Sequence, residues 1–282
     1  MANRNFHVHL VSDSTGETVS SVARACLVQY EGIFVQEHVW SLVRTRGQME
    51  KVMQAVERDR GPVLYTLVDP DLRDCVRDHC RRLQLPCVGV LDQVMSVLAV
   101  HFHSKSEQWP GRQHQLDDGY FDRIDAMHYT LAHDDGQSAH DLDDADVILV
   151  GPSRTSKTPT CVYLANRGVR AANVPLIPAV PPPPELEAAT RPLVVGLITD
   201  PERLVQIRMN RLRLLQQETE TDYTDMDGVQ SEIQEARRLY ARRKWATIDV
   251  TRRSIEETAA SILQMLTVRR EQRMQATESS QN

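Results

Sequence analysis

The segment 151–158, GPSRTSKT, contains the residue types that bind phosphate groups in proteins. A phosphate-binding loop follows a strand and precedes a helix whose N-terminus faces the anion. It also supplies a lysine for the outer phosphates and a hydroxyl for magnesium. Gly151, Lys157 and Thr158 stand where the pattern Gly-x4-Gly-Lys-Ser/Thr requires them, whereas Ser156 replaces the second glycine. Serine is strained wherever φ must be positive, so we expect this loop to have its own geometry. The spacing predicts a nucleotide-binding loop, and the alternative is an ordinary polar turn before a helix.

Two cations lie inside this segment. Only four of the 33 basic residues of the chain are lysines, and this scarcity favours a specific role for Lys157. Arg154 adds a second positive charge, which could clamp a phosphate as an arginine finger does in cis. Loop amides complete the expected set, so the candidate nucleotide-binding residues are Gly151, Pro152, Ser153, Arg154, Thr155, Ser156, Lys157 and Thr158.

Carboxylates beside such a loop could bind a cation or accept a proton. Asp200 ends an apolar stretch, as a magnesium-binding aspartate does in phosphate-loop enzymes, and Thr158 with Asp200 is the predicted metal pair. Asp134 and Asp135 form an acidic turn upstream of the loop, which could hold a metal or take the proton of a hydroxyl nucleophile. Asp13, in a polar loop near the N-terminus, is a candidate of the same kind. For each of them the alternative is a solvated turn or strand end.

Two further groups of side chains could take part in chemistry. One group of thiols and imidazole is close in sequence but fits no closed zinc pattern: Cys75, His79, Cys80 and Cys87. An arginine-rich stretch follows Asp200, and it is either a solvated helix face or a patch for phosphate or an acidic partner: Arg203, Arg208, Arg211 and Arg213.

Strands and helices alternate along the sequence, which favours a mostly parallel α/β sheet flanked by helices. The predicted strands are Phe6–Val11, Gly61–Asp69, Pro86–Leu91, Asp146–Val150, Val174–Pro178, Leu193–Asp200 and Thr247–Val250. The predicted helices are Val19–Leu27, Asp71–Leu83, Tyr120–Ala132, Pro159–Arg167, Pro201–Leu215, Gly228–Lys244 and Arg253–Val268. The last dozen residues are polar, and we expect them to fray.

An internal echo indicates two related lobes. Leu10–Val22 resembles Leu149–Val162, and Leu67–Arg77 resembles Leu197–Arg208, in the same order in both halves. Chance likeness between α/β units is the alternative. The loop 12–18 of the first half lacks lysine, so it is either a degenerate phosphate site or purely structural.

The echo and the composition together suggest three segments. We expect an N-terminal α/β lobe over residues 1–104, a connecting segment rich in Asp, His and Gln over 105–144, and a C-terminal lobe with a phosphate-loop-like nucleotide site over 145–282.

The overall composition is that of an ordinary globular protein of 282 residues, with 41% hydrophobic and 26% charged residues. The net charge of -6 argues against nucleic acid as a partner. We expect no membrane partner either, because no apolar run approaches the ~20 residues of a membrane span and the N-terminus does not resemble a signal peptide. Five cysteines, an odd number, are most simply reduced thiols, which indicates a cytoplasmic protein.

Five separated segments, in order, carry a resemblance that covers roughly residues 6–268. The sequence resembles the bacterial and plastid regulatory proteins of pyruvate, phosphate dikinase and of phosphoenolpyruvate synthase. The segments are VSDSTGET, YTLAHDDG, GPSRTSKTPTCVYLA, GLITDPERLVQIR and WATIDVTRRSIEETAASIL.

This resemblance implies a bifunctional serine/threonine kinase and pyrophosphorylase. Such proteins use ADP to phosphorylate a threonine beside the catalytic histidine of the target enzyme, which inactivates it. They reverse the modification by phosphorolysis, in which inorganic phosphate attacks the phosphothreonine and pyrophosphate leaves. The Arg-Thr-Ser-Lys core and DVTRRSIEETAA favour the dikinase as target, whereas YTLAHDDG resembles the synthase branch. The family also suggests a homodimer.

Carried onto this sequence, the family's chemistry places ADP, and inorganic phosphate in the reverse reaction, on the loop 151–158, with Mg²⁺ beside it. The catalytic candidates are then the two cations and three carboxylates named above: Lys157, Arg154, Asp134, Asp135 and Asp200. Two other hypotheses stay open: a small-molecule kinase or NTPase that consumes ATP, and a non-catalytic ADP sensor. A sensor tolerates loss of the carboxylates, whereas a kinase does not.

Overall fold

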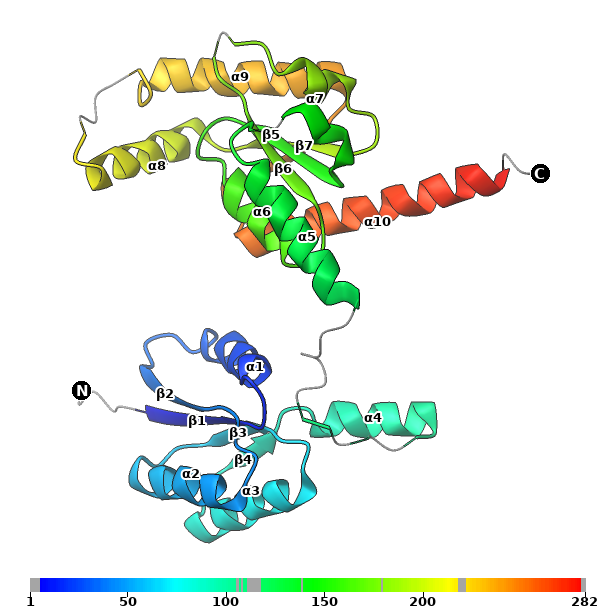
Figure 1. The fold of residues 1–282 in the computed structure, drawn as a ribbon. Helices are drawn as coiled ribbons and strands as arrows, with labels where there is room; N and C mark the ends of the chain where they lie inside the picture. Colours follow the sequence, from blue (N-terminus) through cyan, green and yellow to red (C-terminus); the bar gives the residue numbers. More distant parts are fainter. Residues whose placement is uncertain are drawn as a thin grey trace. The chain divides into compact units, whose positions relative to one another are not determined.

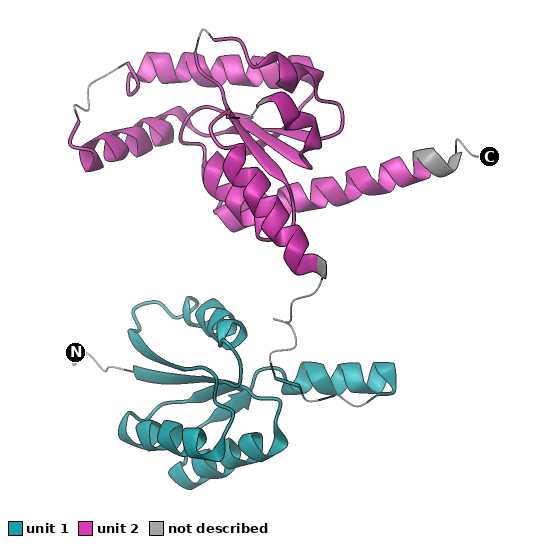
Figure 2. Cartoon of the chain, in the orientation of Figure 1, with its two compact units in different colours: residues 1–115 teal, residues 116–282 magenta. Residues whose placement is uncertain are grey.

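A computed structural model describes residues 6–104, 107, 109–110, 118–137, 139–178, 180–217 and 222–279. The chain divides into two compact units, residues 1–115 and 116–282 (Figure 2). The segment that the sequence predicts as a connection, 105–144, contributes one helix and one 3-10 turn to the second unit.

Unit 1 is a four-stranded parallel sheet with strand order β2-β1-β3-β4 (Figure 1). Its strands are β1 (Phe6–Ser12), β2 (Val35–Trp40), β3 (Val63–Thr66) and β4 (Cys87–Gly89). Its helices are α1 (Glu17–Leu27), α2 (Arg46–Arg58), α3 (Pro70–Leu83) and α4 (Asp92–Phe102).

The two faces of this sheet are covered by different helices. Val11 and Tyr65 point to the side where α2 and α3 supply Met49 and Val76. Neighbouring side chains along a strand face opposite ways, so Leu10 packs on the other side, in the cluster that includes residues of α1. These buried apolar contacts fix the carboxyl end of β1, where the polar loop 12–18 begins, and the carboxyl end of β3 beside it.

Unit 2 repeats the arrangement, with a parallel sheet in the order β6-β5-β7-β8 (Figure 1). Its strands are β5 (Val147–Gly151), β6 (Ala171–Pro175), β7 (Leu193–Ile198) and β8 (Ala246–Asp249). Its helical elements are α5 (Asp118–Ala132), η2 (Ala139–Asp144), α6 (Lys157–Ala165), α7 (Pro184–Ala188), α8 (Pro201–Leu214), α9 (Met226–Arg243) and α10 (Ile255–Ser279).

The core of unit 2 also lies on both faces of its sheet. Ile148 and Val150 pack with residues of η2, α7 and α9, including Tyr240. Leu149 faces the opposite side, where α6 and α10 contribute residues such as Leu164 and Ile262. Helix α6 is therefore held directly against β5, and the loop that joins them has its two ends fixed.

Both units have the same strand order, and this confirms the predicted fold class of two α/β lobes with parallel sheets flanked by helices. The echoed segments occupy equivalent positions. Each polar loop follows the first strand of its sheet, and Asp69 and Asp200 each cap a helix that begins with proline after the third strand. In such sheets ligands bind at the carboxyl ends of the strands, where the strand order reverses, and both polar loops lie there.

Five of the described elements are absent from the sequence-based prediction: β2, α2, α4, η2 and α7. The strand predicted at Val174–Pro178 is β6, which begins and ends three residues earlier. The expectation that the last dozen residues fray is wrong for 271–279, since α10 continues to Ser279, and the rest of it lies outside the described residues. Its last turns are rich in Arg, Gln, Glu and Ala, which favour helix without needing burial. Among the described helices, none is both long and apolar enough to cross a membrane.

Candidate functional site

The loop between β5 and α6 has the strained backbone that its sequence indicates. Arg154 and Ser156 adopt φ of 75° and 60°, in the left-handed region that non-glycine residues rarely use. A Cβ at Gly151 would come within 2.5 Å of the Leu197 carbonyl oxygen on β7, so the close approach of two strands requires glycine there. Ser156 is the N-cap of α6, and its side chain makes no capping hydrogen bond within the described part of the chain. The amides of the first turn of α6 therefore have no side-chain cap.

Lys157 lies inside this loop. Its side chain is buried, and Nζ donates hydrogen bonds to Gly151 O at 2.9 Å and Pro152 O at 2.8 Å. Burial lowers the pKa of Lys157 to about 8, and the nearby carboxylate of Asp135 opposes the shift. Thr155 Oγ1 donates to Pro152 O at 2.9 Å, so the loop carries its own internal hydrogen bonds.

A buried ion pair supports the loop from α8 and α9. Arg208 forms two contacts with Glu232, Nη1 to Oε2 at 2.8 Å and Nη2 to Oε1 at 3.0 Å. Nη2 also donates to Ser153 O at 3.2 Å, and the guanidinium lies 4.3 Å from the ring centre of Tyr223. The Tyr223 hydroxyl is 3.2 Å from Ser153 Oγ. Arg208 therefore positions the loop, whereas the other members of the arginine stretch are exposed: Arg203, Arg211 and Arg213.

The acidic turn meets the start of α6. Thr158 Oγ1 donates to Asp134 Oδ1 at 2.9 Å. Asn173, on β6, places Nδ2 at 2.6 Å from the same oxygen, 3.2 Å from Asp135 Oδ1 and 3.0 Å from Thr158 Oγ1. Asp135 is exposed, so the cluster opens to solvent on its side. The structure thus brings together three residues proposed from the sequence and adds Asn173, which sequence reasoning missed.

The turn itself is anchored by His133, which is buried at the end of α5. Its ring stacks on Tyr129 with centroids 3.8 Å apart. Nδ1 lies 2.7 Å from Tyr129 O and Nε2 2.6 Å from Asp141 Oδ1. The hydrogen bond from His133 holds the pKa of Asp141 below its usual range. Main-chain hydrogen bonds from Asn173 N to His133 O and from Gly136 N to Asn173 O, at 2.9 and 2.8 Å, fasten the turn along β6.

Asp200 has a different setting from the other proposed carboxylates. It is exposed at the N-cap of α8, where Oδ1 accepts a hydrogen bond from Arg203 N at 3.1 Å. Its own amide donates to Thr251 Oγ1 at 2.8 Å. Within the described residues no hydrogen bond joins Thr158 to Asp200. The hydroxyl of Thr158 is instead engaged by the acidic turn.

The equivalent loop of unit 1 surrounds a hollow of about 190 Å³, lined by residues 12–18 with Thr66 and Val68. Asp13 is buried there, and its Oδ2 accepts a hydrogen bond from Val68 N at 2.7 Å. Burial raises the pKa of the Asp13 carboxyl. The Asp13 carboxylate thus ties the first polar loop to the segment after β3, which is a structural contribution of that side chain.

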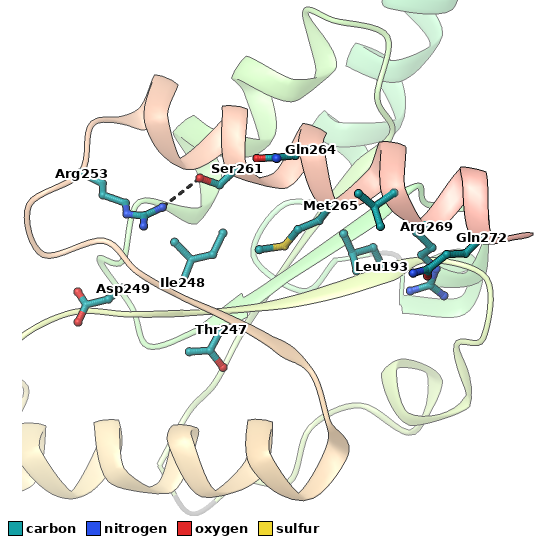
Figure 3. A pocket seen from close by; sticks show the side chains of 11 residues that line it. Leu193, Thr247, Ile248, Asp249, Arg253, Ser261, Gln264, Met265, Arg269 and Gln272 are labelled. Carbon is teal, nitrogen blue, oxygen red and sulfur yellow. Dashed lines mark hydrogen bonds between the residues drawn. The ribbon is translucent and has the colours of Figure 1, made fainter.

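A larger hollow, of about 740 Å³, lies between β8 and α10 in unit 2 (Figure 3). Its lining mixes apolar side chains such as Met265 with Arg253, which donates to Ser261 Oγ at 3.0 Å. It contains none of the loop, acidic-turn or β6 residues described above. We therefore place the candidate site at the loop 151–158, where cations, hydroxyls and carboxylates converge.

Comparison with known proteins assigns the chain to a family. The sequence model of the family described as kinase/pyrophosphorylase matches residues 8–263. The chain belongs to the kinase/pyrophosphorylase family. Three bacterial members of this family carry the provisional name pyruvate, phosphate dikinase regulatory protein.

All three relatives match nearly the whole chain. The protein from Rhodospirillum rubrum is 53% identical over 94% of this chain and 97% of its own length. The one from Paramagnetospirillum magneticum is 56% identical over 93% of this chain and 84% of its own. The one from Bradyrhizobium diazoefficiens is 49% identical over 96% of this chain and 98% of its own. Family membership therefore extends over both units.

Proposed function

We propose that this chain is a bifunctional serine/threonine kinase and pyrophosphorylase that regulates pyruvate, phosphate dikinase. In the forward direction the β-phosphoryl group of ADP passes to an active-site threonine of the dikinase, which leaves AMP and an inactive phosphoenzyme. In the reverse direction inorganic phosphate attacks the phosphothreonine, pyrophosphate leaves and the threonine hydroxyl is restored. The family match and the names of the relatives support this target.

One observation carries the proposal: a buried lysine and the start of a helix lie within one loop that also contacts an acidic turn through Thr158. Phosphoryl transfer requires mainly positioning and charge stabilisation, and these groups supply both. In this scheme Lys157, Arg154 and the amides of α6 hold the β-phosphate of ADP. The same groups hold inorganic phosphate in the reverse reaction.

An acid–base group must take the proton of the target threonine. Asp134 already accepts hydrogen bonds from Thr158 and Asn173, so its Oδ1 is engaged. Asp135 is exposed at a turn with φ of 52°, where a protein substrate can reach it. Of the two carboxylates proposed from the sequence, Asp135 is therefore the better base, and Asp134 organises the site.

Magnesium fits the donor set at this loop, because hydroxyl, carboxylate and amide oxygens are the hard ligands that it prefers. Asn173 also has a buried Oδ1 that finds no hydrogen-bond partner among the described residues. When bound, the ion would offset negative charge on the phosphate oxygens. Thr158 and Asp200 are the ligands proposed from the sequence, and Asp134 lies against Thr158.

Two variants separate a kinase from a non-catalytic ADP sensor. Asp135→Asn and Asp134→Asn should leave ADP binding, measured by calorimetry, within about threefold of the wild type. Phosphoryl transfer to the dikinase should fall by about 10²-fold or more in Asp135→Asn, the usual contribution of a general base, and should also fall in Asp134→Asn because that carboxylate organises the site. Unchanged transfer in both variants would contradict the proposed role of the turn. Label on phosphoenolpyruvate synthase, with none on the dikinase, would reassign the target and keep the chemistry.

A further inference from the structure

The surroundings of Asn173 do not satisfy the hydrogen-bonding groups of its carboxamide. The side chain is 1% exposed and lies on β6, opposite Leu149 of β5. Its Nδ2 contacts three oxygens, those of Asp134, Asp135 and Thr158, although an amide nitrogen has only two hydrogens to donate. Its Oδ1 is buried and accepts no hydrogen bond within the described residues. A buried acceptor without a hydrogen bond is unfavourable, so this arrangement calls for a reason.

The spacing of three polar atoms at Asn173 suggests a reason for this arrangement. Thr158 Oγ1 and Asp134 Oδ1 are 2.9 Å apart, and Asn173 Nδ2 lies 3.0 and 2.6 Å from them. Magnesium binds oxygen at about 2.1 Å in octahedral geometry, which places neighbouring ligands about 3.0 Å apart. The three atoms thus form a triangle of the size of one octahedral face. Two corners are oxygens, and the third is a nitrogen that cannot bind a metal.

We propose that Asn173 is a ligand of a divalent cation, together with Asp134 and Thr158, and that its carboxamide turns over when the cation binds. In the cation-free chain the NH2 group bridges the carboxylates and the hydroxyl. Rotation by about 180° about the last side-chain bond puts Oδ1 at the same corner. The rotation completes three oxygen ligands on one face and gives Oδ1 the cation as its partner. The NH2 group moves to the position that Oδ1 leaves, so the bond to the cation must outweigh the hydrogen bonds that NH2 gives up.

The rest of the cluster suits this role. The Asp134 side chain has a second oxygen, and Asp135 stands exposed beside the triangle, so water and phosphate oxygens can complete the coordination. The turn cannot easily withdraw, because main-chain hydrogen bonds join it to Asn173 on both sides. The site deepens the proposed function, since a cation there would lie beside the loop that holds the phosphates. Its existence is nevertheless testable without any dikinase.

Mn²⁺ binding to the full chain, followed through the electron paramagnetic resonance signal of free Mn²⁺, tests the ligand set. The wild type should bind Mn²⁺, Asn173→Ala should weaken binding by about tenfold or more, and Asn173→Asp should restore it, because a carboxylate oxygen replaces the amide oxygen. Asn210→Asp, which adds the same charge on the exposed side of α8, is the control and should match the wild type. No binding by the wild type, or equal binding by Asn173→Ala, would overturn the proposal.

A second measurement follows the rotation in the unaltered chain, and a variant serves only to assign the signal. The NH2 cross-peaks of ¹⁵N-labelled asparagine side chains are recorded, and those of Asn173 are identified by their loss in Asn173→Asp. Addition of Mg²⁺ should shift the Asn173 pair, since its hydrogens leave the carboxylates, and leave those of Asn210 in place. An unmoved Asn173 pair in saturating Mg²⁺ contradicts the rotation. Failure of phosphoryl transfer with these shifts intact would count against the proposed function alone.

Discussion

The binding of ADP should depend on pH through Lys157, whose charge is set by its burial in the loop. Burial lowers its pKa to about 8. About nine in ten unliganded chains therefore carry the charged amine at pH 7, and about one in ten at pH 9. The terminal phosphate of ADP is already ionised over this range, because its second pKa is about 6. If binding requires the charged lysine, ADP affinity should fall about tenfold from pH 7 to pH 9.

Titration calorimetry in two buffers of different ionisation enthalpy measures both the affinity and the protons taken up. Uptake should rise from near zero at pH 7 to about one proton per ADP at pH 9. Lys157→Ala should bind ADP weakly and show no such rise. Lys51→Ala, an exposed lysine of α2, should behave as the wild type. Equal affinity at the two pH values, or a decline that persists in Lys157→Ala, would refute the assignment of this residue to the phosphates.

The same shift has a consequence for stability, with a definite sign. The pKa of Lys157 is lower in the folded chain than the 10.5 of an ordinary lysine, so the folded state binds fewer protons between about pH 8 and 10.5. The cost of burying the charged amine is therefore fully present below pH 8. The cost is lost as pH rises through that window, so the folded chain gains stability there. Bound ADP should abolish this gain, because it keeps the amine charged.

Three further comparisons test the architecture of unit 2, one of them with a control variant in α2 of unit 1. Arg208→Met should lower the free energy of unfolding by about 3–5 kcal/mol, because it leaves the buried carboxylate of Glu232 without its partner. The double variant Arg208→Met/Glu232→Leu should recover most of this loss. Hydrogen exchange of the β5 and β7 amides measures both. A smaller loss of stability in the single variant than in the double would contradict a supporting role for the Arg208–Glu232 ion pair. Gly151→Ala should destabilise unit 2 by about 2 kcal/mol or more, because the new Cβ meets a backbone carbonyl oxygen. Gly47→Ala, at an open position in a helix, is the control and should stabilise the chain by about 0.5 kcal/mol. Thermal unfolding measures both changes. Asp141→Asn should be less stable than the wild type at pH 7. The difference should shrink as pH falls below about 4, the pKa of an unfolded aspartate, and should vanish once pH is below the lowered pKa of the wild-type carboxyl. Acid titration by circular dichroism that shows no such convergence would contradict a stabilising contact between His133 and Asp141.

The sequence could predict the loop because its signal is local. A strand, a run of small and hydroxyl residues, one scarce lysine and a helix follow one another within a few residues, so no tertiary information is needed. The acidic turn was found in the same way. Its contact with Thr158 could not be, since it depends on a turn laid along β6 and on the pairing of β6 with β5.

Asn173 shows what kind of signal was overlooked. It is a polar residue in an otherwise apolar strand, AANVP, and buried polar groups need a partner. The sequence alone gives no hint that the partner is 39 positions away at Asp134. Arg208 is a similar case. Four arginines follow Asp200, and only the helical spacing from the buried Leu204 to Arg208 marks the one that faces inward.

The missed elements have a related cause. Strand β2 lies at the edge of its sheet, where β1 is its neighbour among the described strands. Its alternating residues are half-exposed, so its apolar pattern is weak. Helix α4 has no fully buried residue, and its apolar run lacks the helical periodicity on which the prediction relied. The duplicated strand order, by contrast, was visible as a sequence echo, because the loops and helix caps that follow the first and third strands carry recognisable residues.

The most direct test of the central claim follows the β-phosphate of ADP. ADP labelled at that position is mixed with the full chain and with pyruvate, phosphate dikinase in its phosphohistidine form. The proposed function predicts label on a dikinase threonine with release of AMP, and loss of that label as pyrophosphate when inorganic phosphate is added. Label on neither the dikinase nor phosphoenolpyruvate synthase, while ADP still binds to the loop, would contradict it and leave a nucleotide sensor.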